Sequence, residues 1–344
     1  MRVALLTHPA SSVFRGGPRV QLEQTATELK TLGVEIVHVT GENQVGPRDV
    51  DLVHIFGAGM GTYHVARALR LQSIPMVVSP IYITRRSPMQ VRAVRGVDRM
   101  MRRLFPGFWT DYGMIAEMCD WSKIVAPNTD EEGALLRHAF GVPQDKLMKI
   151  PNGVEERFAH ASPDLFVREY GMKDFVLNVG HIGPARKNIR RLVRALETTN
   201  IPSVIIGRIE ETEEARQIVE RARRHPAMLV LDHLDHASEM LASAYAAARV
   251  FVLPSLFETP GIAALEAALA GASVVITPHG GTREYFDDLA VYVDPYSVAD
   301  IRRGIEEAFG KVQSDTLSWR VGERFLWKHV AARTLEVYRQ ALSG

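Results

Sequence analysis

The stretch Val250-Phe-Val-Leu-Pro-Ser-Leu-Phe-Glu258-Thr-Pro-Gly261-Ile-Ala-Ala-Leu-Glu266-Ala-Ala-Leu-Ala-Gly271 decides the fold of this chain. Its first four residues form an apolar run, which predicts a strand buried on both faces. Gly261 then opens a predicted helix whose apolar side chains repeat at helical spacing, and Gly271 ends that helix. A buried strand followed directly by a helix is the repeating unit of a parallel α/β sheet.

Two carboxylates lie in this stretch, eight residues apart. Glu258 follows the strand, and Glu266 lies about one and a half turns into the helix. Parallel α/β sheets bind ligands where strands end and helices begin, because the first amides of a helix are free there. Glu266 stands among alanine and leucine residues, where an ionised carboxylate is costly to bury without a partner. The pattern therefore favours a binding site over a plain loop, which stays the alternative.

The composition is that of a globular protein with about two domains. The chain has 344 residues, of which 46% are hydrophobic and 24% charged, and a net charge of +1 gives no overall attraction to nucleic acid. The single Cys119 excludes an intrachain disulfide and a cysteine-rich metal site, and it fits a reducing cytoplasm. No apolar run approaches the roughly 18 residues of a membrane span, and the first residues turn polar too quickly for a signal peptide.

Strands and helices alternate along the chain, which predicts doubly wound parallel sheets. In the first half, the runs predicted as strands are residues 1–7, 34–40, 51–56, 75–79, 123–127 and 148–151. In the second half they are residues 175–179, 203–206, 228–231, 250–253, 273–276 and 291–293. The polar stretch 155–174, which contains Pro163, is the predicted linker.

The stretch 250–271 resembles the paired-glutamate signature of the retaining GT-B glycosyltransferases of family 4. Four further segments resemble that family: Gly16-Gly17, Pro151-Asn-Gly-Val154, the segment 179–188 and the segment 279–285. The resemblance implies an α/β, GT-B fold, in which two Rossmann-like doubly wound parallel-sheet domains enclose an interdomain cleft. It places an acceptor-side domain at residues 1–160 and a donor-binding domain at residues 170–324. A C-terminal helix at about 325–344 is expected to cross back to the first domain.

The resemblance also implies the site residues. Glu258 and Lys187 are the expected catalytic residues, Glu258 on the transferred sugar and Lys187 on the donor diphosphate. Glu266 is expected to contact the ribose hydroxyls, because a carboxylate accepts both hydrogen bonds of a vicinal diol. The other residues expected to bind the donor are Gly16, Gly17, His181, Arg186, Leu234, Thr259, Pro260, Gly261 and Ile262.

Two positions depart from the family pattern. His181 stands where the family has an arginine, and a histidine is largely neutral near pH 7 whereas an arginine stays charged. Arg186 is the candidate that compensates. After the strand at 75–79, where many relatives carry a histidine, this chain offers Ser79, Tyr82 and Arg85 as acceptor-side candidates, and the sequence does not choose between them.

No metal or cofactor is expected. Asp232-His-Leu-Asp-His236 contains metal-ligand residue types, but the family runs this loop beside the nucleobase. Asp49-Val-Asp51 imitates the Asp-x-Asp metal clamp of the other glycosyltransferase fold, yet it precedes a strand and is interpreted as a solvated turn. The glycine run 57–61 lacks the spacing and the acidic ribose partner of a dinucleotide site, so dinucleotide binding is a weak alternative.

We therefore expect a cytoplasmic, metal-independent, retaining hexosyltransferase that moves sugar from a UDP- or GDP-sugar to a glycan, lipid-linked or other acceptor hydroxyl. Synthesis of cell-envelope polysaccharide is the expected setting, with no nucleic-acid partner. Two alternatives stay open: a non-catalytic sugar-nucleotide-binding relative and a GT-B sugar-nucleotide epimerase. The sequence does not determine the base, the sugar, the acceptor or the linkage.

The segment 85–109 holds seven arginines against one acid, Asp98. Helical spacing predicts one apolar face and a largely opposite arginine face. The predicted apolar face is Val94, Val97, Met101, Leu104 and Phe105, and the predicted arginine face is Arg92, Arg95, Arg99 and Arg102. Such a helix either packs on the core with solvated arginines or lies on an anionic membrane, here the inner face.

Overall fold

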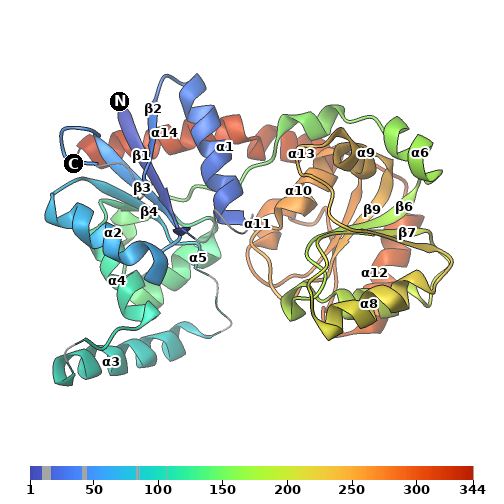
Figure 1. Cartoon of the computed structure of the whole chain (residues 1–344), viewed down its shortest axis with the longest axis horizontal. Helices are drawn as coiled ribbons and strands as arrows, with labels where there is room; N and C mark the ends of the chain where they lie inside the picture. The colour runs from blue at the N-terminus through green and yellow to red at the C-terminus, as the bar shows by residue number, and fades with distance from the viewer. Residues whose placement is uncertain (10–16, 41–44, 83, 85, 106, 344) are drawn as a thin grey trace. The chain divides into compact units, whose positions relative to one another are not determined.

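The computed structural model describes residues 1–9, 17–40, 45–82, 84, 86–105 and 107–343. The chain divides into two compact units. Unit 1 is Met1–Gly153 together with Trp327–Gly344, and unit 2 is Val154–Leu326. Each unit is a parallel sheet covered by helices (Figure 1), so the predicted doubly wound α/β class is confirmed.

Unit 1 is built on a five-stranded parallel sheet with the strand order β2-β1-β3-β4-β5. Its strands are β1 (Arg2–Thr7), β2 (Glu35–His38), β3 (Leu52–Phe56), β4 (Met76–Ser79) and β5 (Ile124–Val125). Its helices are α1 (Gly17–Thr31), α2 (Met60–Leu71), α3 (Pro88–Leu104), α4 (Asp111–Trp121), α5 (Asp130–Leu135) and α14 (Trp327–Ser343). A π-helical turn at Leu136–Phe140 continues α5, and a 3₁₀ turn covers Gln144–Lys146.

Alternate side chains of β1 enter two cores, as the period of two in a strand requires. Val3 and Leu5 pack with buried residues of α1 and α14. Ala4 and Leu6 pack with buried residues of α2 and α4, which cover the other face of the sheet (Figure 1). The C-terminal helix is therefore part of the core of unit 1.

Residues 148–151 do not form the predicted strand. The neighbouring strand β5 is only two residues long, and Pro127 follows it closely. It therefore offers little backbone for another strand to pair with. The amide of Met148 donates to the carbonyl of Val125 and that of Ile150 to the carbonyl of Pro127, and Pro151 has no amide to continue the pattern. The segment lies beside β5 without becoming a regular strand.

A buried polar contact links α14 to the sheet of unit 1. His54 on β3 is completely buried, with its Nδ1 atom 2.8 Å from the hydroxyl of Tyr338 and its Nε2 atom 3.0 Å from that of Ser79. Burial lowers the pKa of His54 to about 3, so the ring is neutral. A neutral imidazole has one donor and one acceptor, and the two hydroxyls satisfy both.

Removal of the Tyr338 hydroxyl should therefore destabilise unit 1. The variant Tyr338→Phe leaves one ring nitrogen of His54 buried without a partner, which costs about 1–3 kcal/mol. Urea denaturation and hydrogen exchange at the amides of β3 measure the loss. Tyr296→Phe is the control because Tyr296 is half-exposed. Equal unfolding free energies for the two variants would show that the His54–Tyr338 contact contributes nothing.

Helix α3 follows only part of its predicted pattern. Val97, Leu104 and Phe105, which pack on the core in one of the two interpretations, are each more than half exposed. Two of the arginines point inward: Arg95 donates to the Ala139 carbonyl at 2.8 Å, and Arg102 pairs with a carboxylate of helix α4. Packing of the whole apolar face on the core is therefore wrong, because internal acceptors hold these two arginines, whereas the other arginines of the predicted arginine face are exposed.

Unit 2 is built on a six-stranded parallel sheet with the strand order β11-β10-β9-β6-β7-β8. Its strands are β6 (Phe175–Val179), β7 (Ser203–Ile206), β8 (Met228–Leu231), β9 (Ala248–Leu253), β10 (Ser273–Ile276) and β11 (Val291–Tyr292). Its helices are α6 (Asp164–Tyr170), α7 (Ile189–Leu196), α8 (Glu213–Arg223), α9 (Glu239–Ala247), α10 (Ile262–Leu269), α11 (Thr282–Phe286), α12 (Val298–Gly310) and α13 (Thr316–Phe325). Two 3₁₀ turns cover Glu156–His160 and Ala185–Lys187.

The strand order of unit 2 reverses between β6 and β9. From β6 the chain proceeds to β7 and β8 on one side, then returns to β9 and continues to β10 and β11 on the other. This is a topological switch point, where the loops that leave two neighbouring parallel strands separate to opposite faces and open a ligand crevice. The loops after β6 and β9 are therefore the structural candidates for a site.

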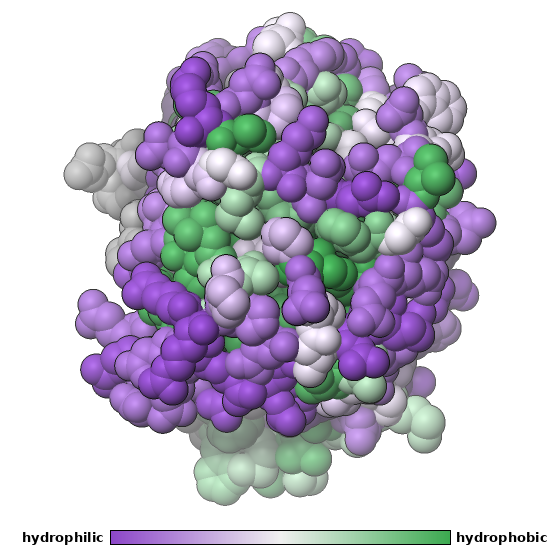
Figure 2. Space-filling view, turned by 90° about the vertical axis from the view of Figure 1, so that its right-hand side faces the viewer, coloured by the Kyte–Doolittle hydropathy of each residue, from purple (hydrophilic) through white to green (hydrophobic). Residues whose placement is uncertain are grey.

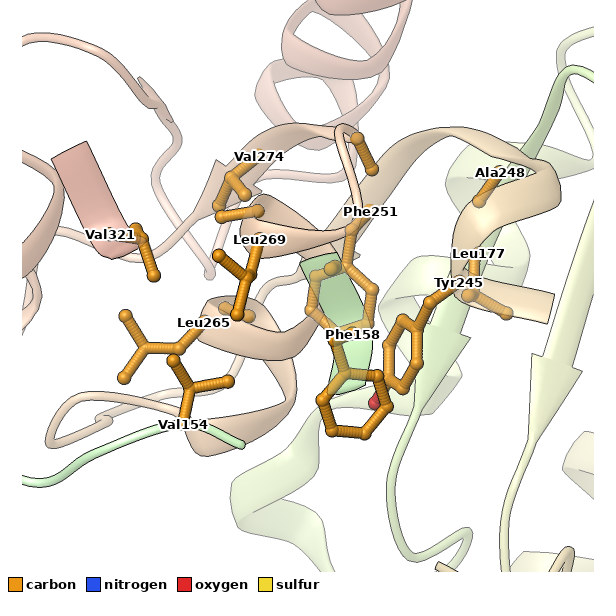
Figure 3. Close-up of a cluster of buried hydrophobic side chains, with 14 of the residues drawn as sticks. Val154, Phe158, Leu177, Tyr245, Ala248, Phe251, Leu265, Leu269, Val274 and Val321 are labelled. Carbon is orange, nitrogen blue, oxygen red and sulfur yellow. The ribbon is translucent and has the colours of Figure 1, made fainter. Parts of the chain in front are cut away.

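The stretch 155–174 is packed into unit 2 and is not a separate linker. Phe158 and Phe166 are completely buried in its core. Figure 3 shows the ring of Phe158 beside that of Tyr245, with ring centroids 5.4 Å apart and the planes nearly perpendicular. The polar composition of the stretch does not reveal that these two side chains are buried. Because the stretch belongs to unit 2, the boundary along the chain lies between Gly153 and Val154.

The apolar residues of unit 2 are largely inside. The front face in Figure 2, which belongs to unit 2, is mainly hydrophilic with scattered hydrophobic residues. No described helix is both long enough and apolar enough to cross a membrane.

Candidate functional site

The loops after β6 and β9 bring the two expected catalytic side chains together. Lys187 ends the 3₁₀ turn after β6, and its ammonium donates to Glu258 Oε1 at 2.5 Å. Arg186 donates from Nη1 to the same oxygen at 3.1 Å. The structure thus joins three of the residues that the sequence predicts, although 71 positions separate Lys187 from Glu258.

Backbone and amide contacts fasten the two loops to each other. Asn188 has a left-handed backbone with φ of 61°, and its buried amide donates to the carbonyls of Pro254 at 2.8 Å and Pro295 at 2.7 Å. The amide of Leu256 donates to the carbonyl of Arg186 at 2.9 Å. Asparagine tolerates this backbone conformation better than most residues do. The backbone of Asn188 thus positions Lys187, while its side chain anchors the loop.

The segment 279–285 supports the backbone of Glu258. The Glu258 amide donates to the carbonyl of His279 at 3.1 Å. Gly280 has φ of +92°, and a Cβ atom there would lie 2.1 Å from the Glu258 carbonyl oxygen. Only glycine allows this approach, which explains why the Gly-Gly turn accompanies the paired glutamates.

Glu258 is ionised despite being 6% exposed. Burial alone would raise the pKa of this carboxyl, but Lys187 and Arg186 outweigh burial and lower it. The pKa of Glu258 is lower in the folded protein than in an unfolded chain, so the ionised carboxylate stabilises the fold at pH values above the pKa of an unfolded glutamate. This contribution to the free energy of unfolding is lost as the pH falls through the pKa of the folded state.

His181 follows β6 but adds no fixed charge. Partial burial, Lys187 and the neighbouring Arg208 and His233 lower its pKa, and Glu210 opposes them only in part. The ring is therefore neutral near pH 7, unlike the arginine of the family pattern. Arg186 supplies a second cation at this strand end.

Helix α10 begins at the same end of the sheet. Gly261 precedes it with φ of +83°, and a Cβ atom there would lie 2.8 Å from Leu253 Cδ2. A cis peptide bond joins Thr259 to Pro260 just before it. No described side chain caps the first turn, so the amides of Ile262 and Ala263 are available to an anion, whereas that of Ala264 donates to the Gly261 carbonyl.

Glu266 is buried in α10 with two hydrogen-bond donors that the sequence analysis did not assign to it. Its Oε1 atom lies 2.7 Å from Nε2 of His236, and its Oε2 atom accepts from the hydroxyl of Tyr245 at 2.7 Å. The cost of burying an unpaired carboxylate predicts that Glu266 has partners. The spacing of residues in the sequence does not identify which residues these are. Leu234, in the same loop as His236, is half-buried.

The other predicted residues lie in unit 1 or outside the described residues. Ser79 is completely buried, and its hydroxyl is held by His54. Tyr82 donates its amide to Glu132 at 2.8 Å, and burial together with Tyr112 raises its pKa to about 12. Gly17 begins α1, whereas Gly16 and Arg85 are outside the described residues.

Sequence reasoning did not predict a cavity of about 550 Å³ in unit 1. It lies between α3, α4 and residues 140–143. Arg102 on its wall pairs with Glu117 and Asp98, while Arg99 and Arg103 form no ion pair with any described residue. In the described ranges, no three His, Cys, Asp or Glu side chains are grouped so as to hold a metal ion.

Residues 166–312 match the family model for glycosyl transferases group 1. The matched residues lie within unit 2. The O-antigen chain mannosyltransferase B of Escherichia coli is 28% identical over 244 residues, which cover 65% of this chain and 62% of that protein. The alpha-maltose-1-phosphate synthase of Mycolicibacterium smegmatis is 24% identical over 390 residues, covering 99% of each. For an uncharacterized glycosyltransferase of Methanocaldococcus jannaschii, the match spans only 56% of the relative's length.

Solved structures agree on the fold. Sucrose-phosphate synthase from Thermosynechococcus elongatus aligns with a TM-score of 0.76 at 18% identity, covering 100% of this chain and 99% of that one. HepE of Anabaena, solved in complex with UDP and glucose, aligns with a TM-score of 0.70 at 17% identity, covering 98% of both chains. The predicted GT-B fold is confirmed.

The Lys187–Glu258 pair should show strong coupling in stability. Lys187→Met leaves the buried carboxylate with Arg186 alone and should cost about 3 kcal/mol, the low end for a buried pair that loses one partner. The double variant Lys187→Met, Glu258→Gln removes the orphaned charge and should recover most of that loss. Urea denaturation gives the coupling free energy. A double variant as unstable as the sum of the two single variants would contradict the pairing.

Proposed function

We propose that the chain is a retaining glycosyltransferase that uses a nucleoside-diphosphate sugar as donor. The observation that carries this proposal is the cation pair Arg186 and Lys187 on the buried carboxylate Glu258, at the switch point between β6 and β9. Cations and free helix amides at one strand end suit a diphosphate, and a carboxylate beside them suits a sugar hydroxyl or a developing positive charge.

The proposed chemistry needs little covalent participation by the protein. The bond between the anomeric carbon and the phosphate oxygen breaks while the acceptor oxygen bonds to the same carbon on the same face. The acceptor proton passes to the leaving phosphate. An ammonium has three donors, so Lys187 can keep its contact with Glu258 while it donates to the phosphate.

Protein groups alone are proposed to stabilise the leaving diphosphate. They are Lys187, Arg186 and the first amides of α10. On this basis we expect no divalent metal to be required. Glu258 is proposed to contact the transferred sugar, and Glu266 the ribose.

Two kinds of relative support a hexose donor. The relative from Escherichia coli is a mannosyltransferase, and HepE was solved with UDP-glucose. We therefore propose a UDP- or GDP-hexose donor and a glycan or lipid-linked acceptor, in a cytoplasmic pathway of envelope polysaccharide synthesis.

Incubation with a panel of UDP- and GDP-hexoses tests the activity. Wild type should transfer sugar or slowly hydrolyse one donor, and activity should survive EDTA. Glu258→Gln should lose most turnover and still bind the nucleoside diphosphate, because its proposed partner is the sugar.

Each other outcome of the panel has a distinct meaning. Binding without turnover favours a non-catalytic relative, which the neutral His181 would suit, and an epimerised donor identifies an epimerase. A loss of activity in EDTA that Mg²⁺ reverses would overturn metal independence.

We further propose that α3 contacts an anionic membrane. Its outward side carries exposed apolar residues beside cations. The apolar residues are Met89, Val97, Met100 and Leu104, and the cations are Arg92, Arg99 and Arg103. A helix with this pattern lies in a membrane interface, and each arginine near the surface contributes about 1 kcal/mol.

Vesicle co-sedimentation tests this contact. The protein should sediment with anionic vesicles at low salt, less at high salt, and little with neutral vesicles. Leu104→Ser should weaken sedimentation, because it removes an exposed apolar side chain from α3. Val312→Ser, at an exposed site in unit 2, is the matched control. Equal sedimentation of both variants, or none for wild type, would reject the contact.

A further inference from the structure

His236 lies between two buried or half-buried carboxylates. Its Nε2 atom is 2.7 Å from Oε1 of Glu266 on α10, and its Nδ1 atom is 3.4 Å from Oε1 of Glu155. Arg157 donates from Nε to the other oxygen of Glu155 at 3.1 Å and also to the backbone carbonyl of His236. Tyr245 on α9 completes the cluster through its bond to Glu266, so four separate segments of unit 2 meet at one imidazole.

The geometry favours an imidazolium ion. A neutral ring that donates from Nε2 to Glu266 would turn the bare lone pair of Nδ1 toward Glu155 Oε1, which is also an acceptor. Among the described residues, no other donor bonds to that buried oxygen. A ring protonated on both nitrogens faces both carboxylates with N–H groups. In agreement, the hydrogen bond that His236 donates to Glu266 raises the pKa of His236 against the opposing effects of burial and Arg157.

We propose that His236, as an imidazolium held by Glu155, is the residue that positions Glu266 for the donor ribose. This rests on the proposed function, in which Glu266 accepts from the ribose. A carboxylate has about four lone-pair sites, and His236 and Tyr245 occupy two of them, which leaves about two for the vicinal diol. His236 therefore determines which lone pairs of the Glu266 carboxylate can accept hydrogen bonds from the ribose.

The position of His236 also connects two parts of donor recognition. It shares its short loop with Leu234, the residue expected beside the nucleobase. The network therefore holds the base loop against the ribose carboxylate, and it is anchored by Glu155 and Arg157 at the start of unit 2. Loss of the charge should loosen ribose recognition without touching the phosphate or sugar contacts.

A pH dependence with a definite sign follows. The cation is present below the raised pKa of His236 and disappears as the pH rises through it. The charged and titratable groups of the cluster around the ring are Glu266, Glu155, Arg157 and Tyr245. Donor KM should therefore increase with rising pH, while kcat changes little.

The test compares His236→Gln with wild type on the donor that the panel identifies. Glutamine keeps an N–H donor but not the charge, so donor KM should rise about tenfold, the effect of one weakened charge-assisted hydrogen bond, and its rise with pH should vanish. Glu155→Gln should raise KM in the same direction. His160→Gln, an exposed histidine of unit 2, is the matched control and should behave as wild type.

Two further readouts separate positioning from general damage. Wild type should bind UDP more tightly than 2′-deoxy-UDP (GDP and its deoxy form for a guanosine donor), and His236→Gln should lose most of that preference. ¹⁵N spectra should show both His236 nitrogens protonated at pH 7. Wild-type transfer with an unchanged KM and an unchanged 2′-hydroxyl preference in His236→Gln would overturn this inference alone. If wild type neither transfers sugar nor binds a nucleotide, the proposed function fails instead.

Discussion

A carboxylate buried at the end of a strand must have cations beside it, and Glu258 imposes this constraint on unit 2. Lys187 and Arg186 meet it through one shared oxygen. Placing them requires the left-handed turn at Asn188, which ties the loop after β6 to the loop after β9. It also requires Gly280, where any side chain would collide with the Glu258 backbone. The loops after three strands are thus interlocked around one charge.

The second carboxylate of the pair is compensated differently. Glu266 lies inside a helix and is held by an imidazole and a phenol. The partner of Glu266 is thus a histidine, whose pKa the contact with Glu266 raises. Two glutamates eight residues apart are therefore held by different kinds of side chain.

Much of unit 2 was predictable because its strands are continuous apolar runs. Such runs indicate a buried strand from the local sequence alone, without knowledge of the neighbouring strands. All six predicted strands of the second half form. The resemblance located Glu258, Lys187 and Arg186, which the structure brings together. Tertiary contacts decided the rest. The stretch 155–174 has linker-like composition but is anchored by Phe158 and Phe166. Arg95 and Arg102 of α3 turn inward because a carbonyl and a carboxylate accept hydrogen bonds from them. No spacing rule connects His236 to Glu266 across 30 residues.

The central claim is that the Lys187 ammonium at the β6–β9 switch point binds the donor diphosphate. Calorimetric titration of the nucleoside diphosphate into wild type and Lys187→Ala tests it most directly, with the exposed Lys173→Ala as control. The variant should bind more weakly by about 2–5 kcal/mol, the range for truncating a hydrogen-bonded charge, and the control should match wild type. Unchanged affinity in Lys187→Ala, with the fold intact, would contradict the claim.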